Sequence, residues 1–139
     1  MPSDILFLDT AYAIALVSPE DKWHSKAVAL AQDTQARKLR MLTTQAIVLE
    51  IGNALSKPRL RPAAVELLTS ILTDTRIEIV ALIPALIRQA FGLFQQRPDK
   101  NWGMTDCTSF VVMKERAVHG ALTTDEHFEQ AGFTALLRH

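Results

Sequence analysis

The sequence has little cysteine, no long apolar run and no excess of charge of either sign. Cys107 is its one cysteine among 139 residues, so no internal disulfide can form, and a lone cysteine in an apolar run is expected in the core. This cysteine usage is typical of a reducing cytoplasm. The 15 Lys and Arg residues balance 15 Asp and Glu residues, which excludes whole-molecule attraction to nucleic acid or anionic lipid but permits a local basic surface.

Signals for membrane insertion or secretion are also missing. The longest apolar run, from Ile79 to Ile87, contains Pro84 and is far shorter than the roughly 20 residues that cross a bilayer. The opening segment MPSDILFLDTAY has no basic region before its apolar run and reaches Asp9 too early for a signal peptide. We therefore expect a soluble, cytoplasmic protein without membrane contact.

The residues that are present have the patterning of an α/β domain. No repeat or Gly/Ser linker divides the chain, so residues 1–139 are expected to form one domain. Short apolar runs predict strands at 5–8, 41–44, 77–80, 120–123 and 133–137. Helical periodicity predicts helices at 11–17, 21–36, 45–55, 63–72, 84–96 and 105–117, and a short helical turn at 125–130. This alternation predicts a parallel sheet with helices on both faces.

Four acids are expected to meet at one edge of that sheet. Asp9 directly follows the first strand and Asp125 follows strand 120–123, so both lie where the carboxyl ends of parallel strands gather. Asp106 begins a helix that runs away from this edge and is followed by the strand that returns to it. Glu50 lies in the second turn of its helix, at the margin of the apolar stripe, and helical side chains tilt toward the N-terminus.

Each acid alone has an ordinary structural explanation: ending a strand, starting or capping a helix, or lying solvated on the surface. Together they are costly, since two unit charges about 5 Å apart repel by roughly 3 kcal/mol at an effective dielectric of about 20. Sharing protons or holding a cation would relieve this repulsion. Oxygen ligands with no expected His or Cys partner favour Mg²⁺ or Mn²⁺. The acids therefore predict metal-assisted phosphodiester hydrolysis.

With its acids in this order, the chain resembles the PIN-domain family, and within it the VapC-type toxins and their stand-alone relatives. LDT, TDC and LTTDEHF carry the likeness, and residues 99–133 are its most specific part. The resemblance implies a PIN-like three-layer α/β/α sandwich with a central parallel sheet. It also implies a Mg²⁺- or Mn²⁺-dependent endoribonuclease, the toxin of a type II toxin–antitoxin pair, with RNA as substrate. A homodimer is implied too, as is a small antitoxin that lays a segment and a basic residue across the acidic groove.

The same resemblance implies a role for each acid. Asp9 and Asp106 would be the main metal ligands, and Asp125 would complete the metal shell. Glu50 would bind metal or orient the nucleophile. The alternative is a non-toxin PIN-like domain that binds RNA or a protein partner with little or no cleavage. A phosphoacceptor domain is excluded, because LDTAY offers a single acid and LTTDEHF has no lysine.

Side chains beside the acids are assigned supporting or structural roles. Thr10 and Thr123 match hydroxyl positions that support the site by hydrogen bonding in the family. Tyr12 departs from the small or polar residue that many relatives carry. His127 stands two residues after Asp125, so it either approaches the site or lies at the surface, and the surface position is favoured.

The basic turn and the two tryptophans each allow two interpretations. Lys57, Arg59 and Arg61 form a proline-punctuated basic turn, which either follows an RNA backbone or is a solvated loop. Trp23 and Trp102 either stack on bases or are partly buried in the fold or in a dimer interface.

Overall fold

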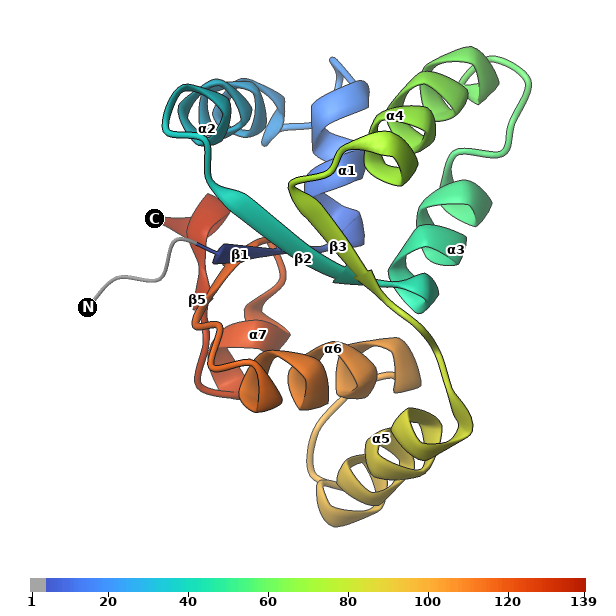
Figure 1. Cartoon of the computed structure of the whole chain (residues 1–139), viewed down its shortest axis with the longest axis vertical. Helices are drawn as coiled ribbons and strands as arrows, with labels where there is room; N and C mark the ends of the chain where they lie inside the picture. The colour runs from blue at the N-terminus through green and yellow to red at the C-terminus, as the bar shows by residue number, and fades with distance from the viewer. Residues whose placement is uncertain (1–4) are drawn as a thin grey trace.

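The structure, a computed structural model, describes residues 5–139 (Figure 1). Residues 1–4, the start of the segment MPSDILFLDTAY, lie outside the described residues. The strands are β1 (Ile5–Leu8), β2 (Arg40–Thr44), β3 (Ile77–Val80), β4 (Gly120–Leu122) and β5 (Thr134–Ala135). The helices are α1 (Thr10–Val17), α2 (His24–Ala36), α3 (Gln45–Ala54), α4 (Arg61–Thr73), α5 (Pro84–Gln96), α6 (Met104–Glu115), α7 (Glu126–Gln130) and the 3₁₀ helix η1 (Leu136–Arg138).

The strands form one sheet in the order β3-β2-β1-β4-β5, and every pairing is parallel. β1 lies in the centre, where Phe7 pairs with Leu42 of β2 and Leu8 pairs with Leu122 of β4. The predicted parallel sheet is confirmed. Because the strand order reverses direction at β1, the loops after β1 and β4 flank the crevice where parallel sheets bind ligands.

Helices cover both faces of the sheet and complete three layers, as expected. α1 contacts α2, α3 and α4 on one side of the sheet, while α6 contacts α5 and α7 on the other (Figure 1). Among residues 5–139, no helix has both the length and the apolar character needed to cross a bilayer.

Aromatic rings join β1 to the α6–α7 layer. The ring centroids of Phe128 and Phe110 lie 5.0 Å apart, and those of Phe128 and Phe7 lie 6.1 Å apart. Trp102 is buried with its ring 5.0 Å from that of Phe110, so it packs in the fold and is not a free stacking platform. Cys107 is buried and unpaired, which confirms its assignment to the core.

The predicted last strand, 133–137, was wrong except for Thr134 and Ala135. β4 has three residues, and Thr134 and Ala135 pair with two of them, so the ladder ends there. The chain then turns into η1, and the Leu137 N–H donates to the Thr123 carbonyl at 3.1 Å. This contact holds the C-terminal segment against the loop that follows β4.

Helix boundaries shift where the backbone forms a turn. α2 begins at His24 and not at residue 21, because Asp21 closes a turn: its carboxylate accepts the Trp23 N–H at 2.8 Å. α6 ends at Glu115, two residues early, because Ala117 adopts the left-handed conformation with φ of 54°. These shifts leave the predicted acids at the same edge of the sheet.

Candidate metal centre

Four different elements bring the four predicted acids together. Asp9 is the N-cap of α1, directly after β1, and Asp125 is the N-cap of α7, after β4. Asp106 lies in the first turn of α6, and Glu50 lies in the middle of α3. Their charges act on one another: Asp106 and Glu50 raise the pKa of Asp9, and Asp125 and Glu50 raise that of Asp106. The sequence prediction that these carboxylates share one edge therefore agrees with the structure.

Asp9 is the most deeply placed of these acids, with 6% of its surface exposed. Thr123 Oγ1 donates a hydrogen bond to its Oδ2 at 2.6 Å. Burial is the largest influence on its pKa, and repulsion from Asp106 and Glu50 acts in the same direction. Hydrogen bonds from the Thr123 hydroxyl and the Thr10 backbone oppose them, and the pKa rises from 3.8 to about 7. The folded protein can thus hold a proton on Asp9 at neutral pH.

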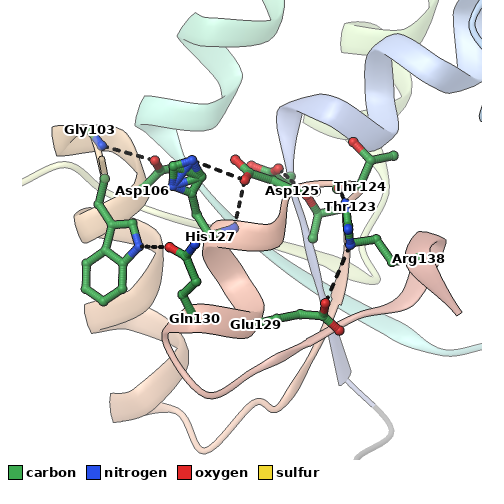
Figure 2. Close-up of polar contacts among 11 residues, drawn as sticks. Gly103, Asp106, Thr123, Thr124, Asp125, His127, Glu129, Gln130 and Arg138 are labelled. Carbon is green, nitrogen blue, oxygen red and sulfur yellow. Dashed lines mark hydrogen bonds and ion pairs between the residues drawn. The ribbon is translucent and has the colours of Figure 1, made fainter. Parts of the chain in front are cut away.

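Asp106 both caps a helix and joins the cluster. Its Oδ2 accepts the Gly103 N–H at 3.1 Å, a contact drawn in Figure 2. Burial raises the pKa of Asp106 most, and the negative charges of Asp125 and Glu50 raise it further. The Gly103 N–H and His127 lower it. Helix capping therefore occupies one carboxylate oxygen, and the same side chain remains among the other acids.

The two predicted supporting threonines both bond to acids of the cluster. Thr10 is buried, and its hydroxyl donates to Glu50 Oε1. Thr123 is fully buried and links two acids, because its Oγ1 donates to Asp9 and accepts the Asp125 backbone N–H at 3.0 Å. Neutral hydroxyl and amide groups thus hold the carboxylates. Within residues 5–139, no lysine or arginine forms an ion pair with any of the four acids.

His127 lies beside the acids, the less favoured of the two positions that the sequence left open for it. Asp106, Asp125 and His127 each offer a ligand atom, and these atoms lie within 4.8 Å of one another. Figure 2 shows the His127 ring between the two aspartates. The cause is local: Asp125 caps α7 by accepting the His127 N–H at 2.8 Å, which holds the start of α7 against the carboxylate. The sequence feature that indicated this position is that His127 follows the N-cap acid Asp125 by two residues.

The donor set fits a divalent cation. Carboxylate oxygens suit Mg²⁺ and Mn²⁺, and an imidazole nitrogen suits transition-metal ions. His127 Nδ1 is buried and has no hydrogen-bond partner among the described residues, and Nε2 lies 3.6 Å from Asp125 Oδ1, beyond ordinary hydrogen-bond length. The expectation that no His or Cys lies near the carboxylates was therefore wrong, because the His127 imidazole lies among them.

The basic turn does not join the acids. Lys57 and Arg59 lie in the connection after α3, and Arg61 begins α4. The Arg61 guanidinium donates to the Ser56 carbonyl, with Nε at 3.0 Å, so part of its capacity closes the turn. Contact of these residues with RNA stays a prediction.

A parallel α/β/α sandwich with clustered acids at the edge of its sheet is the arrangement expected of a PIN domain, and the comparison of sequences agrees. Residues 6–134 match the family model described as PIN domain, and the chain belongs to the PIN domain family. Its curated relatives include the 23S rRNA-specific endonuclease VapC20 of two Mycobacterium tuberculosis strains. The chain is 26% identical to each over 129 residues, which cover 93% of this chain and 95% of the relative.

Solved structures have the same fold. The crystal structure of Mycobacterium tuberculosis VapC20, described as a sarcin–ricin loop cleaving toxin, superposes with a TM-score of 0.83 at 24% identity. That match covers 94% of this chain and 97% of VapC20. VapBC2 from Rickettsia felis, bound to a DNA fragment from its promoter, gives a TM-score of 0.65 at 14% identity. It covers 94% of this chain and 96% of that one. The expected family resemblance is confirmed.

Proposed function

We propose that this chain is a metal-dependent endoribonuclease that hydrolyses RNA phosphodiester bonds and acts as the toxin of a type II toxin–antitoxin pair in the cytoplasm. The observation that carries the proposal is the cluster of Asp9, Glu50, Asp106 and Asp125, with which no lysine or arginine of the described residues forms an ion pair. Membership of the PIN domain family and similarity to VapC20 over most of both chains support it.

The position of each residue suggests its role in the reaction. Asp9, Asp106 and Asp125 would hold Mg²⁺ or Mn²⁺, which when bound supplies Lewis-acid activation of water and neutralises charge on the phosphate. Glu50 is fixed by the Thr10 hydroxyl and would orient the attacking water or join the metal shell. Thr123 keeps Asp9 and the start of the α7 segment in register. The reaction class is hydrolysis, in which water attacks phosphorus and the sugar oxygen leaves.

A protein partner is supported by the outer surface of α5. Within residues 5–139, four of the seven strongly exposed large apolar residues belong to α5 or its N-cap: Ile83, Ile87, Phe91 and Phe94. They follow helical spacing along one face, beside the stripe that buries Leu86 and Ala90. Large exposed apolar patches mark protein interaction sites. We assign this face to the homodimer, and the acidic cluster to an antitoxin segment that carries a basic residue.

RNA cleavage with and without metal tests the proposed activity. Purified protein would be incubated with structured and unstructured RNAs, among them a sarcin–ricin loop oligonucleotide, in Mg²⁺, Mn²⁺ or EDTA. We expect internal cleavage that requires metal and is lost in Asp106→Asn, which keeps the shape of the side chain and removes its charge. Equal cleavage by both proteins would contradict the mechanism. Metal binding without cleavage of any RNA would favour the RNA- or protein-binding alternative.

A further inference from the structure

We propose that His127 is itself a ligand of the bound metal, so that the site combines carboxylates with one imidazole and prefers Mn²⁺ to Mg²⁺. This deepens the proposed function and rests on it, because it concerns the ion of the same site. The proposal gives His127 a role that the family resemblance did not.

Position is the first argument. A ligand atom of His127 lies within 4.8 Å of ligand atoms of both Asp106 and Asp125, so small side-chain movements would bring all three to one ion. The three side chains come from two elements, α6 and the start of α7, that pack against each other. They converge from both sides in Figure 2. The Asp125 carboxylate holds the His127 backbone, so the ring is positioned by the acid with which it would share the ion.

The state of the imidazole is the second argument. Nδ1 is buried without a hydrogen-bond partner in residues 5–139, and Nε2 is 3.6 Å from Asp125 Oδ1. At that distance Nε2 makes no hydrogen bond with the carboxylate, so Nε2 is the nitrogen available to an ion, and the unpartnered Nδ1 carries no weight for ligation through Nε2. About a quarter of the side chain is exposed (24%), which leaves a route from solvent to the ring. An ion beside Nε2 would use the nitrogen that faces the acids.

The mixed donor set then determines the preferred ion. Mg²⁺ demands near-ideal octahedral oxygen coordination and keeps several waters, whereas imidazole is a ligand for transition metals. Affinity for N/O donor sites rises along the first-row divalent series, so a nitrogen donor adds more to the binding of a transition ion than to that of Mg²⁺. Mn²⁺ can bind both the carboxylates and the imidazole. Its unpaired electrons couple magnetically to the nucleus of a bound nitrogen, so ligation by His127 can be detected directly.

Pulsed electron paramagnetic resonance of the Mn²⁺-loaded protein tests ligation without relying on activity. Wild type should show hyperfine coupling to one ¹⁴N nucleus, and His127→Gln should lose it. His119→Gln is the matched control, because His119 is exposed at the opposite end of β4, outside the cluster. Calorimetric titration should show about a 10-fold or greater loss of Mn²⁺ affinity in His127→Gln, since even outer-shell partners are worth that much. The loss of Mg²⁺ affinity should be much smaller.

The outcomes separate this inference from the proposed function. Absence of nitrogen coupling in wild type, with Mn²⁺ bound and its binding abolished by Asp106→Asn, would overturn the ligand role of His127 and leave the carboxylate site intact. Equal losses of Mn²⁺ and Mg²⁺ affinity in His127→Gln would overturn the preference. Failure of wild type to bind either ion would overturn both proposals. Circular dichroism of the metal-free variants confirms that each compared protein is folded.

Discussion

Replacing Asp9 with asparagine should remove a pH-dependent loss of stability from the metal-free protein. Burial, with help from Asp106 and Glu50, raises the pKa of Asp9 from 3.8 to about 7. A carboxyl with a higher pKa in the folded state than in the unfolded state binds its proton more tightly when folded. The protonated Asp9 therefore contributes to the free energy of unfolding. This contribution is fully present below about pH 4 and is lost as the pH rises through about 7. At about 1.4 kcal/mol for each pH unit, the loss is of the order of 4 kcal/mol.

Urea unfolding in EDTA at a series of pH values measures this difference. Asp9→Asn keeps a carbonyl oxygen that can accept the Thr123 hydroxyl, so packing and this hydrogen bond are retained. At about pH 4 the free energies of unfolding of wild type and variant should be similar, and at about pH 8 the variant should be more stable by up to about 4 kcal/mol. Asp33→Asn is the control, because Asp33 is half exposed on α2 and pairs with Arg37 at the surface.

Parallel curves for wild type and Asp9→Asn would refute the reasoning, because they would mean that Asp9 does not hold its proton more tightly in the folded state. An equal shift of the stability curve by Asp33→Asn and Asp9→Asn would also refute it, because the effect would then not depend on the burial of Asp9. Saturating Mn²⁺ provides a second check at about pH 8, where the ion replaces the proton as the partner of the carboxylate. There the stability advantage of Asp9→Asn should disappear.

Three other predictions follow from the same contacts. Thr123→Val leaves Asp9 and the Asp125 N–H without their shared hydroxyl and should lower the free energy of unfolding by about 1–3 kcal/mol in urea titrations. Phe128→Ala opens a cavity between β1 and α6 and should cost about 3–5 kcal/mol in the same assay. Removing metal with EDTA should lower the melting temperature of wild type, since an ion at about 100 times its dissociation constant adds about 2.7 kcal/mol; Asp106→Asn should melt equally with and without metal.

The convergence of the acids was predictable because it depends on topology more than on side-chain detail. Once strands alternate with helices, a parallel sheet and right-handed crossovers follow, and Asp9 and Asp125 then share an edge because each follows a strand. Glu50 was placed correctly by the tilt of helical side chains toward the N-terminus. The hydroxyl contacts of Thr10 and Thr123 agree with the family resemblance, which gave the residues but not the partner of each hydroxyl.

Details that depend on short elements were not predictable. The direction of the His127 ring is set by α7, a helix of five residues, and such a helix gives no periodic pattern from which a buried face can be read. The last strand was overestimated because its apolar residues Leu136 and Leu137 suit either a strand or a turn packed on the core. The pKa of Asp9 follows from its burial, which becomes known only when Thr123 and the neighbouring acids are placed around it.

The way in which the carboxylates are held explains why metal binding and stability are coupled here. An arginine or lysine among the acids would cancel their repulsion and also occupy the position of a cation. Instead, hydroxyl and backbone N–H donors fix Asp9, Glu50 and Asp106 while leaving their negative charge. The cost of burying these negative charges beside one another lowers the stability of the metal-free protein at neutral pH, and the same cost favours a divalent ion. A substitution such as Asp9→Asn that relieves it should stabilise the metal-free fold and weaken metal binding together, because both effects arise from removing one charge.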